Sequence, residues 1–127
     1  MGPTATDPLQ GTNIAYVGHM YPMHWADQRL RDEIVTAAAA HPVFLSEWGF
    51  EQNSDPIVDA TITSYGNPFK AFVEEQRVSW TAWCASYDWF PAIFNRDYSL
   101  RVGEGSMGGF LKDWLYEKRT SDVPGGS

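Results

Sequence analysis

The feature that most constrains the fold of this chain is a repeated order of short apolar segments and amphipathic segments. Three runs have the length and apolar character of buried strands, and each precedes a segment whose apolar residues recur with helical spacing. The strands are expected at residues 13–21, 43–48 and 78–85, and the helices at residues 27–40, 67–77 and 106–119. This order is typical of βα units that feed a parallel sheet. The sequence therefore predicts an α/β fold.

Capping and proline signals define the ends of these segments. Pro22 is expected to end the first strand, and Asp27 can cap the first helix. Pro42 ends that helix, because the residue before a proline disfavours the α region. Asn67 is expected as the N-cap of the second helix, with Pro68 at its first position. The last helix is expected to turn three apolar residues inward, namely Phe110, Trp114 and Leu115.

Three βα units cannot close a barrel by themselves. Their sheet would keep two open strand edges and one face without helices, and unpaired edges are sites of association. A homodimer or a complementing chain is therefore expected to cover these edges. Residues 1–12 are expected as an irregular lead-in, residues 13–119 as the folded unit and residues 120–127 as a flexible tail.

The composition narrows the class of partner. A net charge of −7 and a pI of about 4.7 argue against nucleic acid and against an anionic membrane surface. No apolar run approaches the ~20 residues that a membrane span requires. The aromatic content is 15%, and Trp and Tyr offer flat apolar faces on which sugar rings can stack. A neutral partner such as a sugar fits these properties, although aromatic side chains can equally fill a core.

The motifs predict no metal and no cofactor. His19, His24 and Asp27 fit no standard zinc spacing, and no glycine-rich segment has the order of a phosphate-binding loop. Cys84 is the only cysteine, so an intramolecular disulfide is excluded. The start of the chain lacks the basic and apolar regions of a signal peptide, which leaves the compartment open.

Side chains suited to a functional site are expected at the carboxyl ends of the three strands. Because side chains alternate along a strand, Glu47 is expected to share a face with Val43 and Leu45. Carboxyl ends of strands form the active site in (β/α)8 barrels. Glu47 is therefore either a site residue or a strand-end carboxylate in a salt bridge, and its position alone leaves both open. The candidates at the three strand ends are His19, Tyr21, Glu47 and Trp83.

Three motifs follow one another in register with these strands. Residues 18–21 read Gly-His-Met-Tyr, residues 41–50 read His-Pro-Val-Phe-Leu-Ser-Glu-Trp-Gly-Phe, and residues 79–86 read Ser-Trp-Thr-Ala-Trp-Cys-Ala-Ser. They resemble the sixth, seventh and eighth strands of glycoside hydrolase family five, the cellulase family. The final-helix segment 109–114 also fits, so the resemblance runs from residue 13 to about residue 115. It implies the C-terminal part of a (β/α)8 TIM barrel, with about three βα units.

The resemblance implies a role for each strand-end residue. Glu47 corresponds to the nucleophile that forms a glycosyl-enzyme, and Tyr21 corresponds to the residue that donates a hydrogen bond to it. His19 would contact the sugar or hold the carboxylates, and Trp83 would stack beneath the attacked sugar. The implied activity is hydrolysis of β-1,4-linked glycans with retention, acting on an oligo- or polysaccharide in a secreted protein. The candidates for neighbouring sugar subsites lie on the following loops and are Trp25 and Trp89.

The chain departs from the family pattern at the second carboxylate. Retaining hydrolysis uses two carboxyl groups about 5 Å apart, one as nucleophile and one as acid and then base. The resemblance implies an Asn-Glu-Pro motif for the second group, but no Asn-Glu dipeptide occurs here, and the family's early arginine is also absent. Glu51, Asp55 and Asp88 match no family acid, so none of them is assigned that role.

Three interpretations of the chain stay open. It is the nucleophile-bearing portion of a longer enzyme that is weak or inactive alone, or an enzyme completed by self-association or by another chain. The third interpretation is a non-catalytic carbohydrate-binding protein with a tryptophan platform. A binding protein has no need of a carboxylate at position 47, so Glu47 is the residue that discriminates among them.

Overall fold

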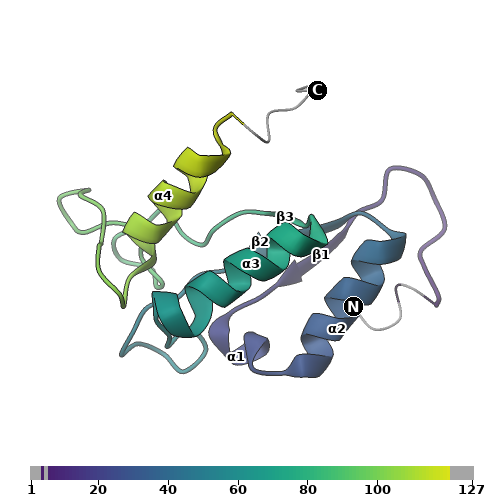
Figure 1. The fold of residues 1–127 in the computed structure, drawn as a ribbon, viewed down its shortest axis with the longest axis horizontal. Helices are drawn as coiled ribbons and strands as arrows, with labels where there is room; N and C mark the ends of the chain where they lie inside the picture. The colour runs from purple at the N-terminus through teal and green to yellow at the C-terminus, as the bar shows by residue number, and fades with distance from the viewer. Residues whose placement is uncertain (1–3, 5, 121–127) are drawn as a thin grey trace.

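A computed structural model of the chain describes residue 4 and residues 6–120. Strand β1 (Tyr16–His19) leads through the short helix α1 (Pro22–Trp25) to helix α2 (Gln28–Ala40) and strand β2 (Val43–Glu47). A π-helical turn, η2 (Ile62–Gly66), then leads into helix α3 (Asn67–Gln76), strand β3 (Ser79–Trp80) and helix α4 (Met107–Lys118) (Figure 1). The order of strands and helices confirms the predicted α/β fold. The expected flexible tail lies outside the described residues except for residue 120.

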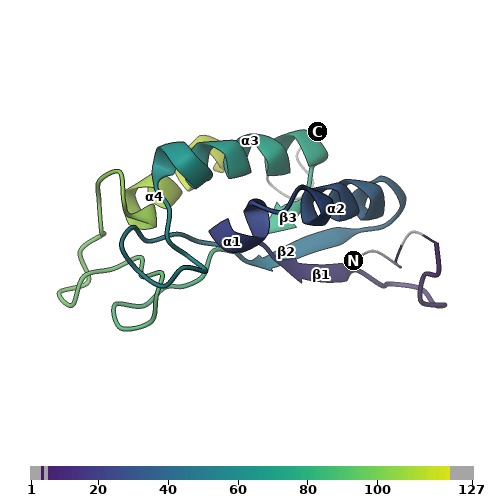
Figure 2. The same ribbon diagram turned by 90° about the horizontal axis from the view of Figure 1, so that it is seen from below.

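The strands form one parallel sheet in the order β1-β2-β3. All the helices lie on one side of this sheet, and Figure 2 shows its other side without a helix. β1 and β3 are both edge strands within the described part of the chain. The exposure of Val17, at 57%, marks the face of β1 that no helix covers. The architecture is therefore a two-layer unit with one bare sheet face and two open edges.

The first helix follows its sequence signals closely. The side chain of Asp27 accepts a hydrogen bond from the backbone N–H of Arg29 at 2.9 Å, which caps α2. Ile34 and Ala37 are buried against the sheet, as the apolar stripe predicts. His41, which precedes Pro42, has extended backbone angles and ends the helix.

Two of the predicted strands are shorter than expected. β1 begins only at Tyr16, whose N–H donates to the Pro42 carbonyl, because β2 offers no partner to residues 13–15. β3 contains only Ser79 and Trp80, although 78–85 was predicted. Beyond it, the residue 81 N–H donates to the Leu45 carbonyl and the residue 83 N–H to the Trp48 carbonyl. An advance of two residues in the segment after β3 thus corresponds to an advance of three residues at the end of β2. A regular ladder of hydrogen bonds therefore cannot continue.

Two helix details differ from the prediction. Asn67 is not the N-cap of α3, because its N–H already donates to the Ile62 carbonyl and the chain enters α3 from the turn η2. In α4, Leu115 is 51% exposed and does not point inward. The buried apolar side chains of α4 are Met107, Leu111 and Trp114. They recur every three or four residues on one face of the helix, and Leu115 lies outside that face.

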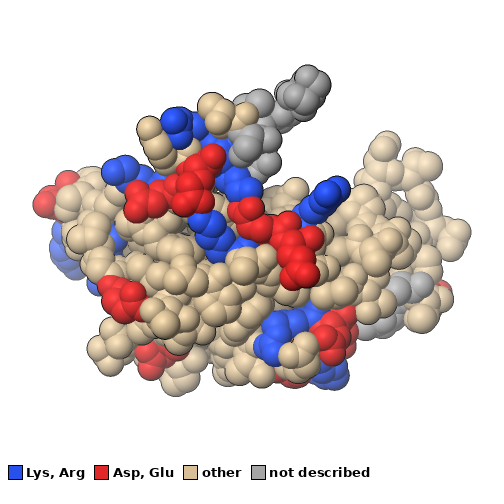
Figure 3. Space-filling model, in the orientation of Figure 1, with Lys and Arg blue, Asp and Glu red and all other residues tan. Residues whose placement is uncertain are grey.

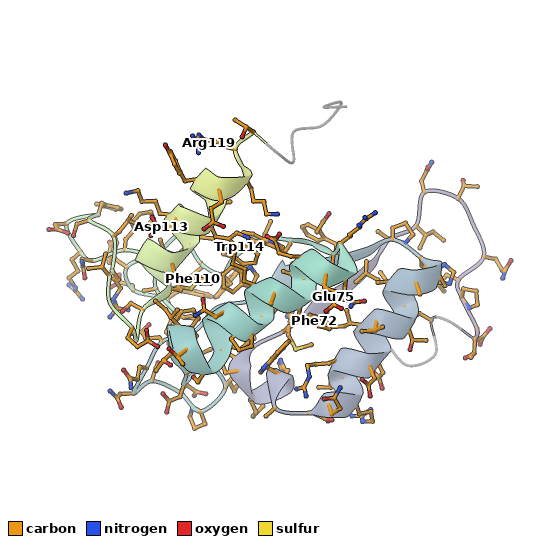
Figure 4. The ribbon with its side chains drawn as sticks, in the orientation of Figure 1. Phe72, Glu75, Phe110, Asp113, Trp114 and Arg119 are labelled. Atoms are coloured by element: carbon orange, nitrogen blue, oxygen red, sulfur yellow. The ribbon has the colours of Figure 1, made fainter. Side chains whose placement is uncertain are left out.

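A group of aromatic side chains joins the sheet to α3 and α4. Trp48, which follows β2, is fully buried, with ring centroids 4.9 Å from Phe69 and 5.3 Å from both Trp80 and Trp114. Figure 4 shows Phe110 and Trp114 on the side of α4 that faces α3. Packing around Trp48 therefore fixes the segment immediately after Glu47.

The outer surface of the helices carries charges of both signs. Figure 3 shows acidic and basic side chains interspersed over α3 and α4. Glu74 on α3 bonds Lys118 and accepts a hydrogen bond from Trp114 Nε1 at 2.7 Å. Burial alone would raise the pKa of Glu74, but the hydrogen bonds from Lys118 and Trp114 outweigh it and hold that pKa below its usual value. These contacts fasten α4 to α3. None of the helices in the described part of the chain is long and apolar enough to cross a membrane.

Candidate active site

Glu47 meets two polar side chains at the carboxyl end of the sheet. Its Oε2 accepts a hydrogen bond from the Tyr21 hydroxyl at 2.9 Å and lies 3.3 Å from His19 Nδ1. Glu47 ends β2, His19 ends β1, and Tyr21 follows β1 at the start of α1. The Glu47 side chain is partly buried and that of His19 is about half exposed. The result is a carboxylate held by the protein on one side and open to solvent on the other.

A register shift in the sheet brings Glu47 to this position. Gly18 pairs with Leu45, but the next residue, His19, pairs with Glu47, so Ser46 is an extra residue in β2. Adjacent residues of β1 point to opposite faces, and their partners must do the same. Glu47 therefore leaves the buried face of Leu45 and joins the face of His19. The prediction that Val43, Leu45 and Glu47 share one face was wrong, because simple alternation does not account for this bulge.

Tyr21 is held as a permanent hydrogen-bond donor. Tyr21 is buried, and this burial raises the pKa of its phenol well above the usual range. The hydrogen bond to Glu47 and the charge of Glu47 raise that pKa further. The phenol therefore stays protonated at any ordinary pH. Its backbone N–H lies 3.3 Å from His24 Nδ1, which ties the residue to the first turn of α1.

The segment after β3 runs beside the end of β2 and reaches the same region. The Trp83 N–H donates to the Trp48 carbonyl at 2.9 Å, and Thr81 Oγ1 donates to the Ser46 carbonyl at 2.8 Å. Burial raises the pKa of the Cys84 thiol, and the charge of Glu47 raises it further.

The two candidate tryptophans on the loops have different surroundings. The ring of Trp89 is 5.9 Å from that of Trp83 and is 65% exposed, so its face is open. Trp25 instead packs between α1 and α3, with its ring 5.4 Å from that of Phe72 and the Arg31 guanidinium 4.9 Å from its centroid. These contacts place the Trp25 ring against the helix layer, and its role at a sugar subsite stays a prediction.

The other carboxylates near the strand ends have their own partners. Glu51 lies 2.7 Å from Arg101 and accepts the Ala92 N–H, which ties two loops together. Asp55 accepts the Ile57 N–H in a turn, and Asp88 lies 3.5 Å from Arg96 at the surface. The described residues also contain no group of His, Cys, Asp and Glu side chains arranged to hold a metal.

Comparison with known proteins finds similarity in structure only. No family model matches the chain, and no curated protein sequence matches it. A β-glucanase from Saccharophagus degradans in complex with cellotetraose matches with a TM-score of 0.79 and 24% identity, over 94% of this chain and 38% of that one. Its native form gives the same values. The catalytic domain of an endoglucanase from Thermobifida fusca with cellotetraose matches with a TM-score of 0.69 and 21% identity, over 91% of this chain and 40% of that one.

These matches establish the architecture of the chain. The neighbours are cellulases and β-glucanases of glycoside hydrolase family five, the family that the strand motifs resemble. The three parallel strands and their helices form part of a TIM barrel, as predicted. The chain spans about two fifths of the length of these neighbours, at 38% to 40%.

Proposed function

We propose that this chain carries the nucleophile side of the active site of a retaining glycoside hydrolase that acts on β-1,4-linked glycans, in the manner of a cellulase or mannanase. The observation that carries the proposal is the contact of Glu47 with both Tyr21 and His19 at the carboxyl ends of adjacent parallel strands. Carboxyl ends of strands form the active sites of (β/α)8 barrels. The strand motifs, and neighbours that bind cellotetraose, support the same reaction class.

The geometry suits nucleophilic attack by Glu47. In this proposal, a carboxylate oxygen of Glu47 bonds the anomeric carbon while the bond to the leaving oxygen breaks, and the leaving oxygen takes a proton from a second carboxylic acid. Water then releases the sugar. Tyr21, which stays protonated, donates a hydrogen bond that orients Glu47 without removing its charge. His19 would contact the sugar or help to hold the carboxylate, while Trp83 stacks beneath the sugar ring and Trp89 extends the platform.

The general acid is proposed to come from outside the described residues. The second carboxyl group must lie about 5 Å from Glu47, and Glu51, Asp55 and Asp88 each have another partner. We therefore propose that this chain is weak or inactive alone and that further βα units supply the acid.

Substrates with different leaving groups test this proposal. The isolated chain should hydrolyse an aryl β-glycoside with a good leaving group faster than cellulose or mannan, and both slowly. A phenolate departs with little proton help, whereas a sugar alkoxide needs the general acid, whose contribution is typically about 10²–10⁴-fold. Initial rates on dinitrophenyl β-cellobioside and on soluble cellulose provide the comparison. Ordinary enzyme rates on the polysaccharide would contradict it, because they require an acid within the chain.

The open edges predict association. A groove at the β3 edge is lined by apolar and by polar side chains, and Val17 is exposed on the bare sheet face. The apolar ones are Val73, Val78, Trp80 and Leu115, and the polar ones are Glu74, Arg77, Ser79 and Lys118. We propose that a complementing chain with further parallel strands covers these surfaces, and that a homodimer or poor solubility results without it. Sedimentation equilibrium at micromolar concentration measures the association state of the chain. A stable, soluble monomer would contradict the expected association.

A further inference from the structure

The loop between β3 and α4 exposes an unusual number of aromatic side chains. In residues 86–100, here called the aromatic loop, Trp89 is 65% and Tyr98 69% exposed, and Tyr87 and Phe90 are exposed as well. Two edge-to-face ring pairs form there, Trp83 with Trp89 at 5.9 Å and Tyr87 with Tyr98 at 5.4 Å. Exposed apolar residues are normally scattered singly, so a group of this kind indicates a binding surface.

Hydrogen bonds hold the aromatic loop in one conformation. The Asn95 N–H donates to the Ser99 carbonyl at 2.8 Å, and the Tyr98 N–H donates to the Asn95 carbonyl at 2.9 Å. The Phe94 N–H donates to the Ser86 carbonyl at 3.1 Å and closes the loop. Tyr98 has a φ of 62°, in the left-handed region that residues with a Cβ adopt at a cost in free energy. The fold thus holds Tyr98 in an unfavourable backbone conformation with its ring exposed to solvent.

The chemistry of the aromatic loop fits a glycan better than a protein partner. Its aliphatic residues Ala92 and Ile93 are buried and Leu100 is half-buried, so the fully exposed apolar side chains of the loop are aromatic. The charged side chains of the loop, Asp88, Arg96 and Asp97, lie at the surface. A sugar needs flat apolar faces with hydrogen-bonding groups at their rims, and this loop offers both. Figure 2 shows the loop beyond the strand ends, extending toward the side of the sheet away from the helices.

We propose that the Tyr87–Tyr98 pair is an accessory glycan-binding position that contacts a β-linked glucan chain beyond the sugars held at Trp83 and Trp89. This inference rests on the proposed function, because the same loop carries Trp89, whose ring contacts that of Trp83. The Trp83 N–H in turn donates to the carbonyl of Trp48, the residue after Glu47. In this proposal, a short glucan contacts the Trp83–Trp89 pair alone. A longer glucan gains a further stacking contact at the Tyr87–Tyr98 pair.

Titration of the full chain with cellotetraose and cellohexaose, followed by NMR, tests the inference. Cellohexaose should bind about five- to tenfold more tightly than cellotetraose, the gain expected of one additional aromatic contact. Tyr98→Asn combined with Tyr87→Ala should abolish this difference and leave the affinity for cellotetraose unchanged. Asparagine is chosen because it tolerates the left-handed backbone of position 98. Tyr98→Phe should retain the preference, since it keeps the ring.

Tyr116→Ala is the matched control, because Tyr116 is 62% exposed but lies on α4, away from the loop. It should leave the preference for cellohexaose intact. A preference that survives the double substitution, or equal affinity of the unsubstituted chain for both sugars, would overturn the inference while leaving the proposed function standing. Failure to bind either sugar would overturn both. If the double substitution changed the sedimentation of the chain but not its sugar affinity, the pair would be a protein contact instead.

Discussion

Replacing Glu47 with glutamine is expected to lower the release of phenolate from dinitrophenyl β-cellobioside by a factor of about 10³–10⁶, the order of loss seen when a covalent nucleophile is removed. Glutamine has nearly the same shape and can still accept the hydrogen bond from Tyr21, so the fold should be unaffected. What is lost is the negative charge that attacks the anomeric carbon. The measurement is the initial rate of phenolate release at high protein concentration.

A matched control separates the site from the overall charge of the chain. Glu75 is an exposed glutamate on α3, on the helix side of the molecule (Figure 4). Glu75→Gln removes the same charge and should leave the rate unchanged. If Glu47→Gln also left the rate unchanged, Glu47 would not be the nucleophile, and a carbohydrate-binding protein with a tryptophan platform would become the better interpretation.

Replacing Trp48 with alanine is expected to lower the free energy of unfolding by about 3–5 kcal/mol, the usual range for removing a buried aromatic side chain. Trp48 is fully buried and contacts rings from three elements of the chain, Phe69, Trp80 and Trp114. Alanine would leave a cavity between the sheet and both α3 and α4. Denaturant unfolding followed by circular dichroism measures the change.

Trp89→Ala is the control for this second prediction. The ring of Trp89 is largely exposed, so its removal should change the free energy of unfolding by no more than about 0.5 kcal/mol. Equal destabilisation by the two substitutions would mean that the aromatic group around Trp48 is not the main core. A large effect at Trp48 alone would identify the aromatic group around Trp48 as the main core.

Local signals in the sequence were sufficient for the central elements. The α2 helix has a capping aspartate at Asp27, an apolar stripe and a terminating proline, and its predicted bounds differ from the structure by one residue. β2 is an apolar run that ends at Glu47, and the prediction of 43–48 includes it. Elements whose bounds depend on their own residues were predicted well.

Features that depend on pairing between segments were not predictable in this way. The extra residue at Ser46 follows from the register of β2 against β1, and the early end of β3 follows from the same irregularity. The sequence placed His19, Tyr21 and Glu47 near one another because they end adjacent strands, but alternation gave Glu47 the wrong face. The packing of Trp25 could not be predicted from its position, because the rings around it come from α3, more than forty residues later.

The most direct test of the account is the intact mass of the chain after incubation with dinitrophenyl β-cellobioside. The same carboxyl group acts first as acid and then as base, so a chain without it should form the glycosyl-enzyme from an activated substrate and release the sugar slowly. We expect a lasting increase in mass of one cellobiosyl group, mapped to the peptide that contains Glu47 and absent from Glu47→Gln. An adduct on another residue, or release of phenolate with no adduct at any time, would contradict it.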